Sequence, residues 1–146
     1  ELRPHVLQRS GLGAAIDELA VEGPWREAEV EIDVARQTDT LEAVAYRALR
    51  ELIVNARKHS KASRLSVRGW QTDGLLRFVV EDDGVGFDVA RALDRDHMRM
   101  HVGLDATGER LNLAGGSFEI ESSPGAGARF ELTLPAQPRA NGDSAS

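Results

Sequence analysis

The segment Leu75-Leu-Arg-Phe-Val-Val-Glu-Asp-Asp-Gly-Val-Gly86 combines a regular strand pattern with a carboxylate in an unexpected place. Its residues alternate between two faces, as in a half-buried β-strand, and Leu76, Phe78 and Val80 share the apolar face. The same alternation puts Asp82 on that face, where a carboxylate is costly unless it is paired or hydrogen-bonded. Glycines follow at once and let the backbone approach another group closely. The segment therefore predicts a strand that ends at a binding pocket.

The rest of the chain alternates between helical and strand patterns. Helices are expected at residues 11–22, from Thr38 or Asp39 to about His59, and at 103–114, and strands at 30–34, 65–70, 75–82, 118–121 and 130–134. Thr72-Asp73-Gly74 predicts a hairpin turn. Because nearly every strand has one polar face, we expect a two-layer α+β domain with an antiparallel or mixed sheet and helices on one side.

Composition limits the classes of function. The 146 residues suffice for one domain with a core, and the net charge of -6 argues against general nucleic-acid binding. Cysteine is absent, which excludes disulfides and thiolate metal sites and is compatible with a reducing, cytoplasmic setting. No apolar run approaches the roughly twenty residues that span a bilayer. The first residue is Glu rather than Met, so we expect a fragment of a longer protein whose membrane attachment stays open.

The two ends and one internal stretch lack a clear period. Residues 1–10 are expected to form an irregular lead-in, 11–135 the folded domain, and 136–146, rich in Pro, Ala, Gly and Ser, a disordered tail. Residues 87–102 are charged and are expected to form a mobile loop. His97 and His101 within it favour a metal site only weakly, because no third ligand is suitably spaced.

A polar stripe of Arg47, Glu51, Asn55, Lys58 and His59 follows the expected long helix. Such a stripe is usually a solvated face, but asparagine is a poor residue inside a helix. Its amide oxygen suits Mg²⁺, which takes few protein ligands besides phosphates and waters. Glu51, one turn away, is placed to orient or deprotonate a nucleophile. The stripe is therefore a candidate metal and catalytic site.

Three further features suit a nucleotide, and each also has a simpler explanation. Asp82 can accept a hydrogen bond from an exocyclic amine such as that of adenine, although Asp before Gly often caps a turn. Gly103-Leu104 opens a helix whose free amides suit phosphate, although an ordinary glycine cap looks the same. Basic residues gather in an otherwise acidic chain, with Lys58 the best phosphate candidate: Arg57, Lys58, His59, Lys61, Arg64 and Arg68.

Together these clusters resemble the GHKL ATP-binding fold of histidine kinases, Hsp90-type chaperones, type II topoisomerases and mismatch-repair ATPases. The similarity is greatest to sensor histidine kinases that partner LuxR-type response regulators. It lies in motifs that occur in chain order. The first are a linking segment at Leu2-Arg-Pro4 with Gly11-Leu12 and an N box at Glu51-Leu-Ile-Val-Asn55-Ala-Arg-Lys58-His59-Ser-Lys-Ala62. A G1 box follows at Val80-Glu-Asp82-Asp-Gly84-Val-Gly86-Phe87-Asp88, then a G2 region at His101-Val-Gly103-Leu104 with Glu109-Arg110 and Ala114-Gly115-Gly116, and a last turn at Ser123-Pro-Gly-Ala-Gly127.

The resemblance implies a two-layer α/β sandwich with a mixed, mostly antiparallel sheet, and a role as the catalytic domain of a sensor histidine kinase. Such a domain binds Mg-ATP and donates the γ-phosphate to a histidine on a separate dimerisation domain. The resemblance implies that Glu51 is the acid/base residue and that Asn55 is the Mg²⁺ ligand. It implies that Asp82 binds adenine, with Gly84 and Gly86 beside the base. Gly103 and Leu104 would meet the phosphates with Lys58 or His59, and residues 87–102 would form a short ATP lid.

Departures from the family pattern keep two alternatives open. Ala128 stands where many relatives have Thr, Asp105-Ala-Thr-Gly108 replaces a Gly-Met-type segment, and no phosphoacceptor helix precedes the domain, His5 being in the wrong context. We therefore expect a monomer that binds nucleotide but phosphorylates little, with its parent's dimerisation domain and a response regulator as partners. The alternatives are a non-kinase GHKL ATPase and a nucleotide-binding module that has lost turnover.

Overall fold

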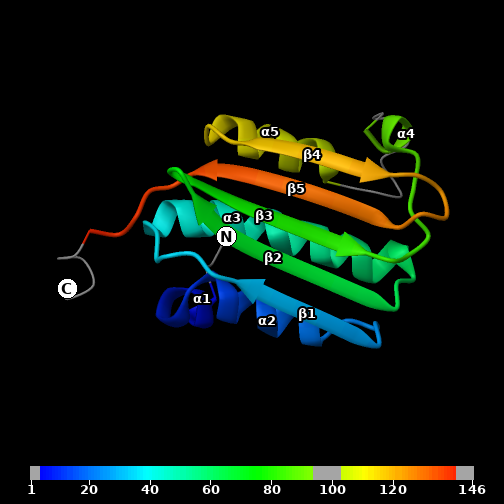
Figure 1. The fold of residues 1–146 in the computed structure, drawn as a ribbon, viewed down its shortest axis with the longest axis horizontal. Coiled ribbons are helices and arrows are strands. Elements are labelled where there is room, and N and C mark those ends of the chain that lie inside the picture. Colours follow the sequence, from blue (N-terminus) through cyan, green and yellow to red (C-terminus); the bar gives the residue numbers. More distant parts are fainter. Residues whose placement is uncertain (1–3, 94–102, 141–146) are drawn as a thin grey trace.

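The computed structural model describes residues 4–93 and 103–140 (Figure 1). The elements in chain order are α1 (His5–Ser10), α2 (Leu12–Val21), β1 (Glu27–Ile32), α3 (Asp39–Asn55), a π-helix (Ala56–Ser60), β2 (Arg64–Thr72), β3 (Leu75–Asp82), α4 (Val89–Leu93), α5 (Leu104–Leu113), β4 (Ser117–Ser122) and β5 (Ala128–Pro135). The sheet order is β1-β2-β3-β5-β4, with β1 and β2 parallel and the other pairs antiparallel. The predicted α+β class and mixed, mostly antiparallel sheet are confirmed.

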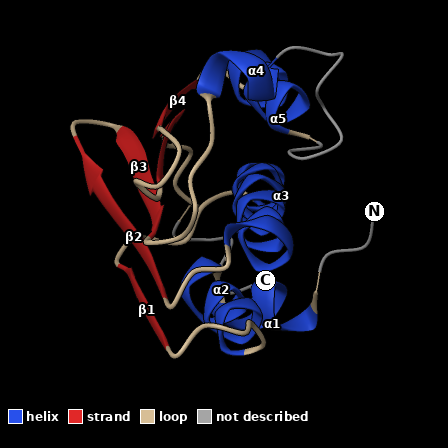
Figure 2. Cartoon of the chain, turned by 90° about the vertical axis from the view of Figure 1, so that its right-hand side faces the viewer, coloured by secondary structure: helices blue, strands red, loops and turns tan. Residues whose placement is uncertain are grey.

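The sheet forms one layer, and α1, α2, α3 and α5 cover one of its faces (Figure 2). Its uncovered face carries ion pairs around Arg129, which contacts Glu131 at 3.2 Å and Glu121 at 3.5 Å. The covered face carries the apolar side chains that the period-two patterns predicted. Asp82 pairs with Leu65 on β2 and with Ala128 on β5, so this carboxylate lies where the covered face of the sheet ends.

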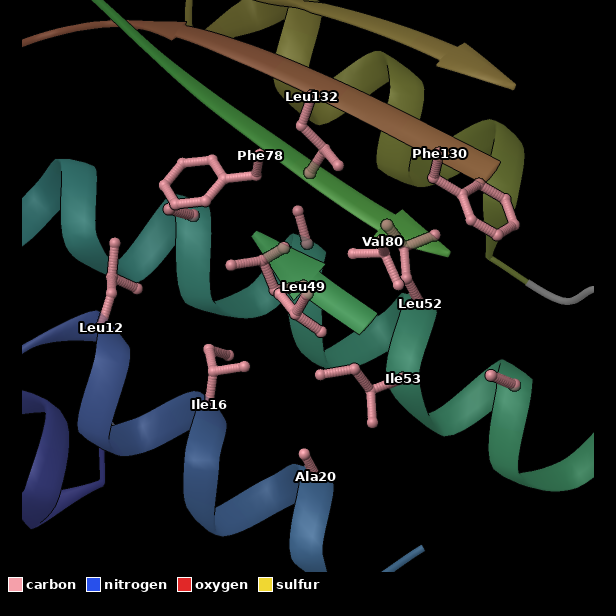
Figure 3. Close-up of a cluster of buried hydrophobic side chains, with 14 of the residues drawn as sticks. Leu12, Ile16, Ala20, Leu49, Leu52, Ile53, Phe78, Val80, Phe130 and Leu132 are labelled. Atoms are coloured by element: carbon pink, nitrogen blue, oxygen red, sulfur yellow. The ribbon is translucent and has the colours of Figure 1, made fainter. Parts of the chain in front are cut away.

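Helix α3 lies across the sheet and contributes buried side chains to the centre of the core (Figure 3). Thr38 caps it, its hydroxyl accepting a hydrogen bond from the amide of Leu41 at 3.4 Å. Leu49, Leu52 and Ile53 are fully buried. The cluster shown in Figure 3 joins α2, α3, β3 and β5 through Leu12, Ile16, Ala20, Leu49, Leu52, Ile53, Phe78, Val80, Phe130 and Leu132. Because this face of α3 is held against the sheet, its polar residues have a fixed position.

The predicted end of the long helix needs a correction. The α-helix stops at Asn55 and continues as a π-helix over Ala56–Ser60. The hydroxyl of Ser60 donates to the carbonyl of Ala56 at 2.7 Å and accepts from the amide of Ala62 at 3.1 Å, and Lys61 then adopts φ 54°. The wider turn changes the direction of the residues after Asn55, and such turns occur frequently at functional sites.

The irregular lead-in predicted for residues 1–10 is wrong for residues 5–10, which form α1. Leu7 is completely buried in the core. The guanidinium of Arg36 donates to the carbonyls of Leu7 at 3.3 Å, Gln8 at 3.0 Å and Arg9 at 3.3 Å. The carbonyl of Leu7 also accepts from the amide of Gly11 at 3.0 Å. Carbonyls in the last turn of a helix lack a partner within the helix, and here a residue far along the chain donates to them.

The disordered tail predicted for 136–146 is wrong for residues 136–140, which are held against the start of α3. The amide of Gln137 donates to the side-chain oxygen of Gln37 at 2.6 Å. Arg139 contacts Asp39 at 2.9 Å and Glu42 at 3.5 Å. Residues 141–146 lie outside the described part of the chain.

Glu42 is the carboxylate on which both ends of the domain depend. It is 1% exposed and accepts hydrogen bonds from Arg36 Nε at 2.9 Å and from the amide of Gln37 at 3.0 Å. Replacing Glu42 by Ala leaves these donors without their acceptor, so the free energy of unfolding should fall by about 3 kcal/mol. Urea denaturation measures the loss. Glu109→Ala, at an exposed position of α5, is the matched control, and an equal effect of both substitutions would contradict the role of Glu42.

Candidate functional site

The loop after β3 is fixed against the π-helix. Asp82 Oδ1 accepts a hydrogen bond from the amide of Gly84 at 2.8 Å, which turns the chain sharply. The amide of Val85 donates to the carbonyl of Ser60 at 2.7 Å. A side chain at Gly84 would collide with that carbonyl. The glycine is therefore required by the close approach of two backbone segments that lie far apart in the sequence.

The turn between β4 and β5 holds the other side of this loop. The amide of Gly125 donates to the carbonyl of Val85 at 2.6 Å, and that of Gly127 to the carbonyl of Gly84 at 3.1 Å. Gly86 has φ +65°, and a side chain there would overlap the carbonyl of Ser123. The loop from 84 to 86 is thus bonded on one side to the end of the π-helix and on the other to the turn between β4 and β5.

Sequence reasoning missed two side chains that hold this loop in place, the carboxylate of Asp83 and the hydroxyl of Ser122. Asp83 Oδ1 accepts from the amides of Arg64 at 2.9 Å and Ser63 at 2.8 Å, and these bonds lower the pKa of Asp83. The hydroxyl of Ser122 donates to the carbonyl of Gly127 at 2.6 Å and accepts from the amide of Phe87 at 3.0 Å. Their position beside glycine-rich turns was the available signal, because short polar side chains often bond the backbone there.

Four of the predicted site residues line one cavity. They are Asn55 from α3, His59 from the π-helix, Asp82 from the end of β3 and Gly86 from the loop. The other lining residues are Leu52, Ala56, Ser60, Val85, Phe87, Ala128 and Phe130. The cavity volume is about 20 Å³, which is room for about one water molecule. Phe87 stacks on Phe130 with ring centroids 6.1 Å apart and forms part of the cavity wall.

Asp82 is half-buried at the wall of this cavity. Burial raises its pKa above the ordinary value for aspartate, and the charge of Asp83 raises it further. The hydrogen bond from the amide of Gly84 opposes this effect and lowers the pKa. A half-buried acceptor with one oxygen already used is suited to recognising a hydrogen-bond donor on a flat, apolar ligand.

The raised pKa of Asp82 predicts how stability depends on pH. The folded state holds the proton more tightly than the unfolded chain, so ionisation of Asp82 destabilises the fold as pH rises from the unfolded pKa of about 4 through the folded pKa. Asp82→Asn removes this cost and keeps an acceptor for Gly84. The variant should be more stable than wild type at pH 7, and the difference should disappear below about pH 4. Urea denaturation at both pH values is the measurement, and a variant less stable at pH 7 would contradict it.

Glu51 and the start of α5 lie side by side. A Cβ built on Gly103, which has φ +99°, would be 3.0 Å from Glu51 Oε2. The side chain of Leu104 is buried in the core, so only its backbone can meet a ligand. Asp105 Oδ1 accepts from the amide of Ala106 at 2.8 Å, so an acidic side chain already occupies one amide of the first turn. This departure from the family pattern adds negative charge where phosphate was expected.

The basic cluster predicted from the sequence is not one patch. Arg57 donates to the carbonyl of Leu19 at 3.2 Å. Arg64 pairs with Glu27 at 3.3 Å and Arg68 with Glu81 at 3.5 Å. Lys58 is exposed and is not among the residues that line the cavity. Of the six basic residues, His59 is the one that lies at the cavity wall.

The predicted lid is described only in part. Asp88 Oδ1 accepts from the amide of Arg91 at 3.1 Å at the start of α4. Residues 94–102, which include His97 and His101, lie outside the described residues.

Within 4–93 and 103–140, no three His, Asp or Glu side chains are grouped to hold a metal ion. Nor does this described part contain a helix with the length and apolar character needed to cross a membrane.

Comparison with known proteins identifies the family of the chain. Residues 40–138 match the family described as histidine kinase-, DNA gyrase B-, and HSP90-like ATPase. The sensor histidine kinase MctS of Rhizobium johnstonii is 36% identical over 92% of this chain, and an uncharacterized sensor-like histidine kinase of Chloroflexus aurantiacus is 33% identical over 92%. The chain spans 30% and 24% of these relatives, respectively.

Solved structures show the same fold. The ATP-binding domain of PrrB from Mycobacterium tuberculosis superposes with a TM-score of 0.66 and 25% identity, covering 86% of this chain and 90% of that one. The histidine kinase domain of the blue-light activated kinase of Erythrobacter litoralis gives 0.68 at 19% identity, covering 84% and 61%. The chain therefore belongs to the family of histidine kinase-, DNA gyrase B- and HSP90-like ATPases, as an ATP-binding catalytic domain of the sensor histidine kinase type.

Proposed function

We propose that the chain binds Mg-ATP and presents the γ-phosphate to a histidine on a separate dimerisation domain of the same parent protein. The observation that supports this most directly is that Asn55, Asp82 and Gly86, from three different elements, line one cavity. Phosphoryl transfer requires mostly positioning and neutralisation of charge. A domain that only holds the nucleotide can therefore donate to an acceptor that another domain supplies.

The proposed roles follow the positions of the side chains. Asp82 accepts a hydrogen bond from the adenine amino group, and Gly84 and Gly86 let the backbone lie beside the base. The amide oxygen of Asn55 fits Mg²⁺, which prefers oxygen ligands. Glu51, one turn of α3 earlier, is the proposed acid/base residue.

The phosphate end of the site is proposed at the start of α5. The backbone amides at Gly103 and Leu104 suit an anion, and Gly103 lies beside Glu51. His59, at the cavity wall, and the exposed Lys58 are the proposed cationic contacts. The carboxylate of Asp105 works against phosphate binding here, so we expect these contacts to be weaker than those to the base.

The base cannot enter the cavity without a movement of its wall. A volume of about 20 Å³ holds a water molecule but not a purine ring. Val85 and Phe87 belong to the wall. Val85 lies in the loop before the predicted lid, and Phe87 is the first residue of that lid. We infer that they shift outward when nucleotide binds.

The downstream partner is proposed to be a response regulator of the LuxR type. The supporting observation is the N-box sequence from Glu51 to Ala62. Transfer of phosphate from the parent's histidine to that regulator is the test of this assignment. It requires the parent protein, because the phosphoacceptor histidine is expected on its dimerisation domain.

Calorimetric titration of the purified chain with ATP, with and without Mg²⁺, tests the nucleotide site. We expect saturable binding that Mg²⁺ strengthens, and little hydrolysis. Steady hydrolysis by the chain alone would favour a non-kinase ATPase. Absence of binding at millimolar ATP would favour a module whose nucleotide site no longer functions, and would overturn the proposal.

A further inference from the structure

The hydroxyl of Ser60 occupies a hydrogen-bond acceptor that an α-helix would give to a backbone amide. It donates to the carbonyl of Ala56 at 2.7 Å. In an α-helix that carbonyl accepts from the amide four residues later, which is the amide of Ser60 itself. Bonds from a serine hydroxyl to the carbonyl four residues earlier often bend helices. The side chain of Ser60 therefore favours the π-helix over a continued α-helix.

The same hydroxyl fixes the direction in which the chain leaves the π-helix. It accepts a hydrogen bond from the amide of Ala62 at 3.1 Å, across Lys61, whose φ is 54°. Ser60 and Ala62 are each 8% exposed. Because water has little access to these backbone groups, the hydroxyl is the partner that satisfies them. One oxygen atom thus bonds the chain both before and after the turn.

The π-helix also decides the side of the helix on which Ser60 lies. Ser60 follows Asn55 by five residues, and in an α-helix it would lie about 140° around the axis from Asn55. In a π-helix the hydrogen bonds run from residue i to residue i+5, so the wider turn brings these two residues toward one side. Both of them line the cavity at Asp82.

The backbone of Ser60 connects this turn to the loop after β3. Its carbonyl accepts a hydrogen bond from the amide of Val85 at 2.7 Å. The preceding residue, Gly84, donates its amide to Asp82 Oδ1 at 2.8 Å, and a side chain at Gly84 would overlap the carbonyl of Ser60. The bonds made by Ser60 therefore set the separation between the end of α3 and Asp82 across the cavity.

We propose that Ser60 is a positioning residue of the nucleotide site, whose hydroxyl holds the loop at 84–86 where Asp82 can recognise the exocyclic amine of the base. This inference rests on the proposed function, because it presupposes that Asp82 binds the base. Without the hydroxyl, a backbone amide can bond the carbonyl of Ala56 and the helix can continue as an α-helix. The carbonyl of residue 60 then moves away from Val85, and Asp82 keeps its charge but loses its fixed orientation.

The test compares ATP with purine riboside triphosphate, which lacks the exocyclic amine, by calorimetric titration in excess Mg²⁺. Wild type should bind ATP at least about tenfold more tightly, the effect of one unpaired hydrogen-bonding group. Ser60→Ala should reduce this preference to less than about threefold, because the group that reads the amine is no longer held in place. Ser60→Thr keeps the hydroxyl and should retain the preference. Hydrogen exchange at the amide of Val85 should be faster in Ser60→Ala and unchanged in Ser60→Thr.

Thr38→Ala is the matched control, because it removes a hydroxyl that bonds the backbone at the opposite end of α3. It should lower the stability of the domain and keep the wild-type preference for ATP, so general destabilisation is not mistaken for lost positioning. If Ser60→Ala does not fold, Ser60→Cys takes its place. The thiol is a weaker hydrogen-bonding group, so this variant should show an intermediate preference.

The outcomes distinguish failure of this inference from failure of the proposed function. If wild type does not bind ATP, or does not prefer it, the role of Asp82 is wrong and the inference falls with it. If wild type prefers ATP and Ser60→Ala or Ser60→Cys keeps the full preference, the proposed function stands and the positioning role of Ser60 is wrong. An equal loss in Ser60→Thr or Thr38→Ala would also contradict that role, because the loss would not depend on this hydroxyl.

Discussion

Replacing Asp82 by asparagine should weaken ATP binding by tenfold to about a hundredfold, while the domain stays folded. One side-chain oxygen at this position must keep accepting the hydrogen bond from the amide of Gly84, which Asp82 Oδ1 accepts at 2.8 Å. In asparagine the other side-chain group is then an amide NH2, and it would face the adenine amino group, donor against donor. The expected loss is the cost of leaving such groups unpaired, about 1–3 kcal/mol.

The matched control for this substitution is Asp73→Asn. Asp73 lies in the exposed turn between β2 and β3 with φ +53°, a conformation that asparagine also tolerates. Asp73→Asn makes the same change of charge at a position away from the cavity, so it should leave the ATP dissociation constant unchanged. Calorimetry on both variants is the measurement. If Asp82→Asn bound ATP as wild type, Asp82 would have no role in recognising the base.

Replacing Asn55 by alanine should abolish the contribution of Mg²⁺ to ATP binding. Asn55 supplies an amide oxygen at the cavity wall, and alanine removes the ligand without harming the helix, because alanine is the better helix former. The ratio of ATP dissociation constants without and with Mg²⁺ should fall to about one.

Titration in EDTA and in excess Mg²⁺ measures this ratio directly, so a general loss of affinity is not mistaken for loss of the metal. Asn112→Ala, at an exposed position of α5, is the matched control and should keep the wild-type ratio. A normal ratio in Asn55→Ala would exclude Asn55 as the Mg²⁺ ligand. The base-binding role of Asp82 would be untouched by that result.

The elements that could be predicted are those whose pattern is local. The strand predicted at 75–82 is β3 (Leu75–Asp82), and the helix predicted at 103–114 is α5 (Leu104–Leu113). The hairpin predicted at Thr72-Asp73-Gly74 has φ of 53° and 78° at its two central residues, as the turn type requires. The alternation of apolar and polar residues and the residue types of a turn depend only on residues close together in the sequence. Packing into the sheet does not alter these local patterns.

The elements that were mispredicted depend on residues distant in sequence. Helix α1 is completed by Arg36, which reaches carbonyls 27 to 29 residues earlier. Residues 136–140 are ordered by Gln37, Asp39 and Glu42, about one hundred residues before them. Composition alone indicated an irregular start and a disordered end, because no local pattern records these contacts.

The sequence by itself determined the order of the strands along the chain, the face on which Asp82 lies and the glycines that let backbone approach it. Tertiary structure decided which polar residues share a cavity. It brings Asn55, His59, Asp82 and Gly86 together, and it sends Arg57, Arg64 and Arg68 to partners elsewhere. It also decided that Phe87 fills the wall against Phe130. The physical reason is that periodicity sets the face of a side chain, whereas its neighbours are set by the packing of α3, the π-helix and the turn after β4 against the end of the sheet.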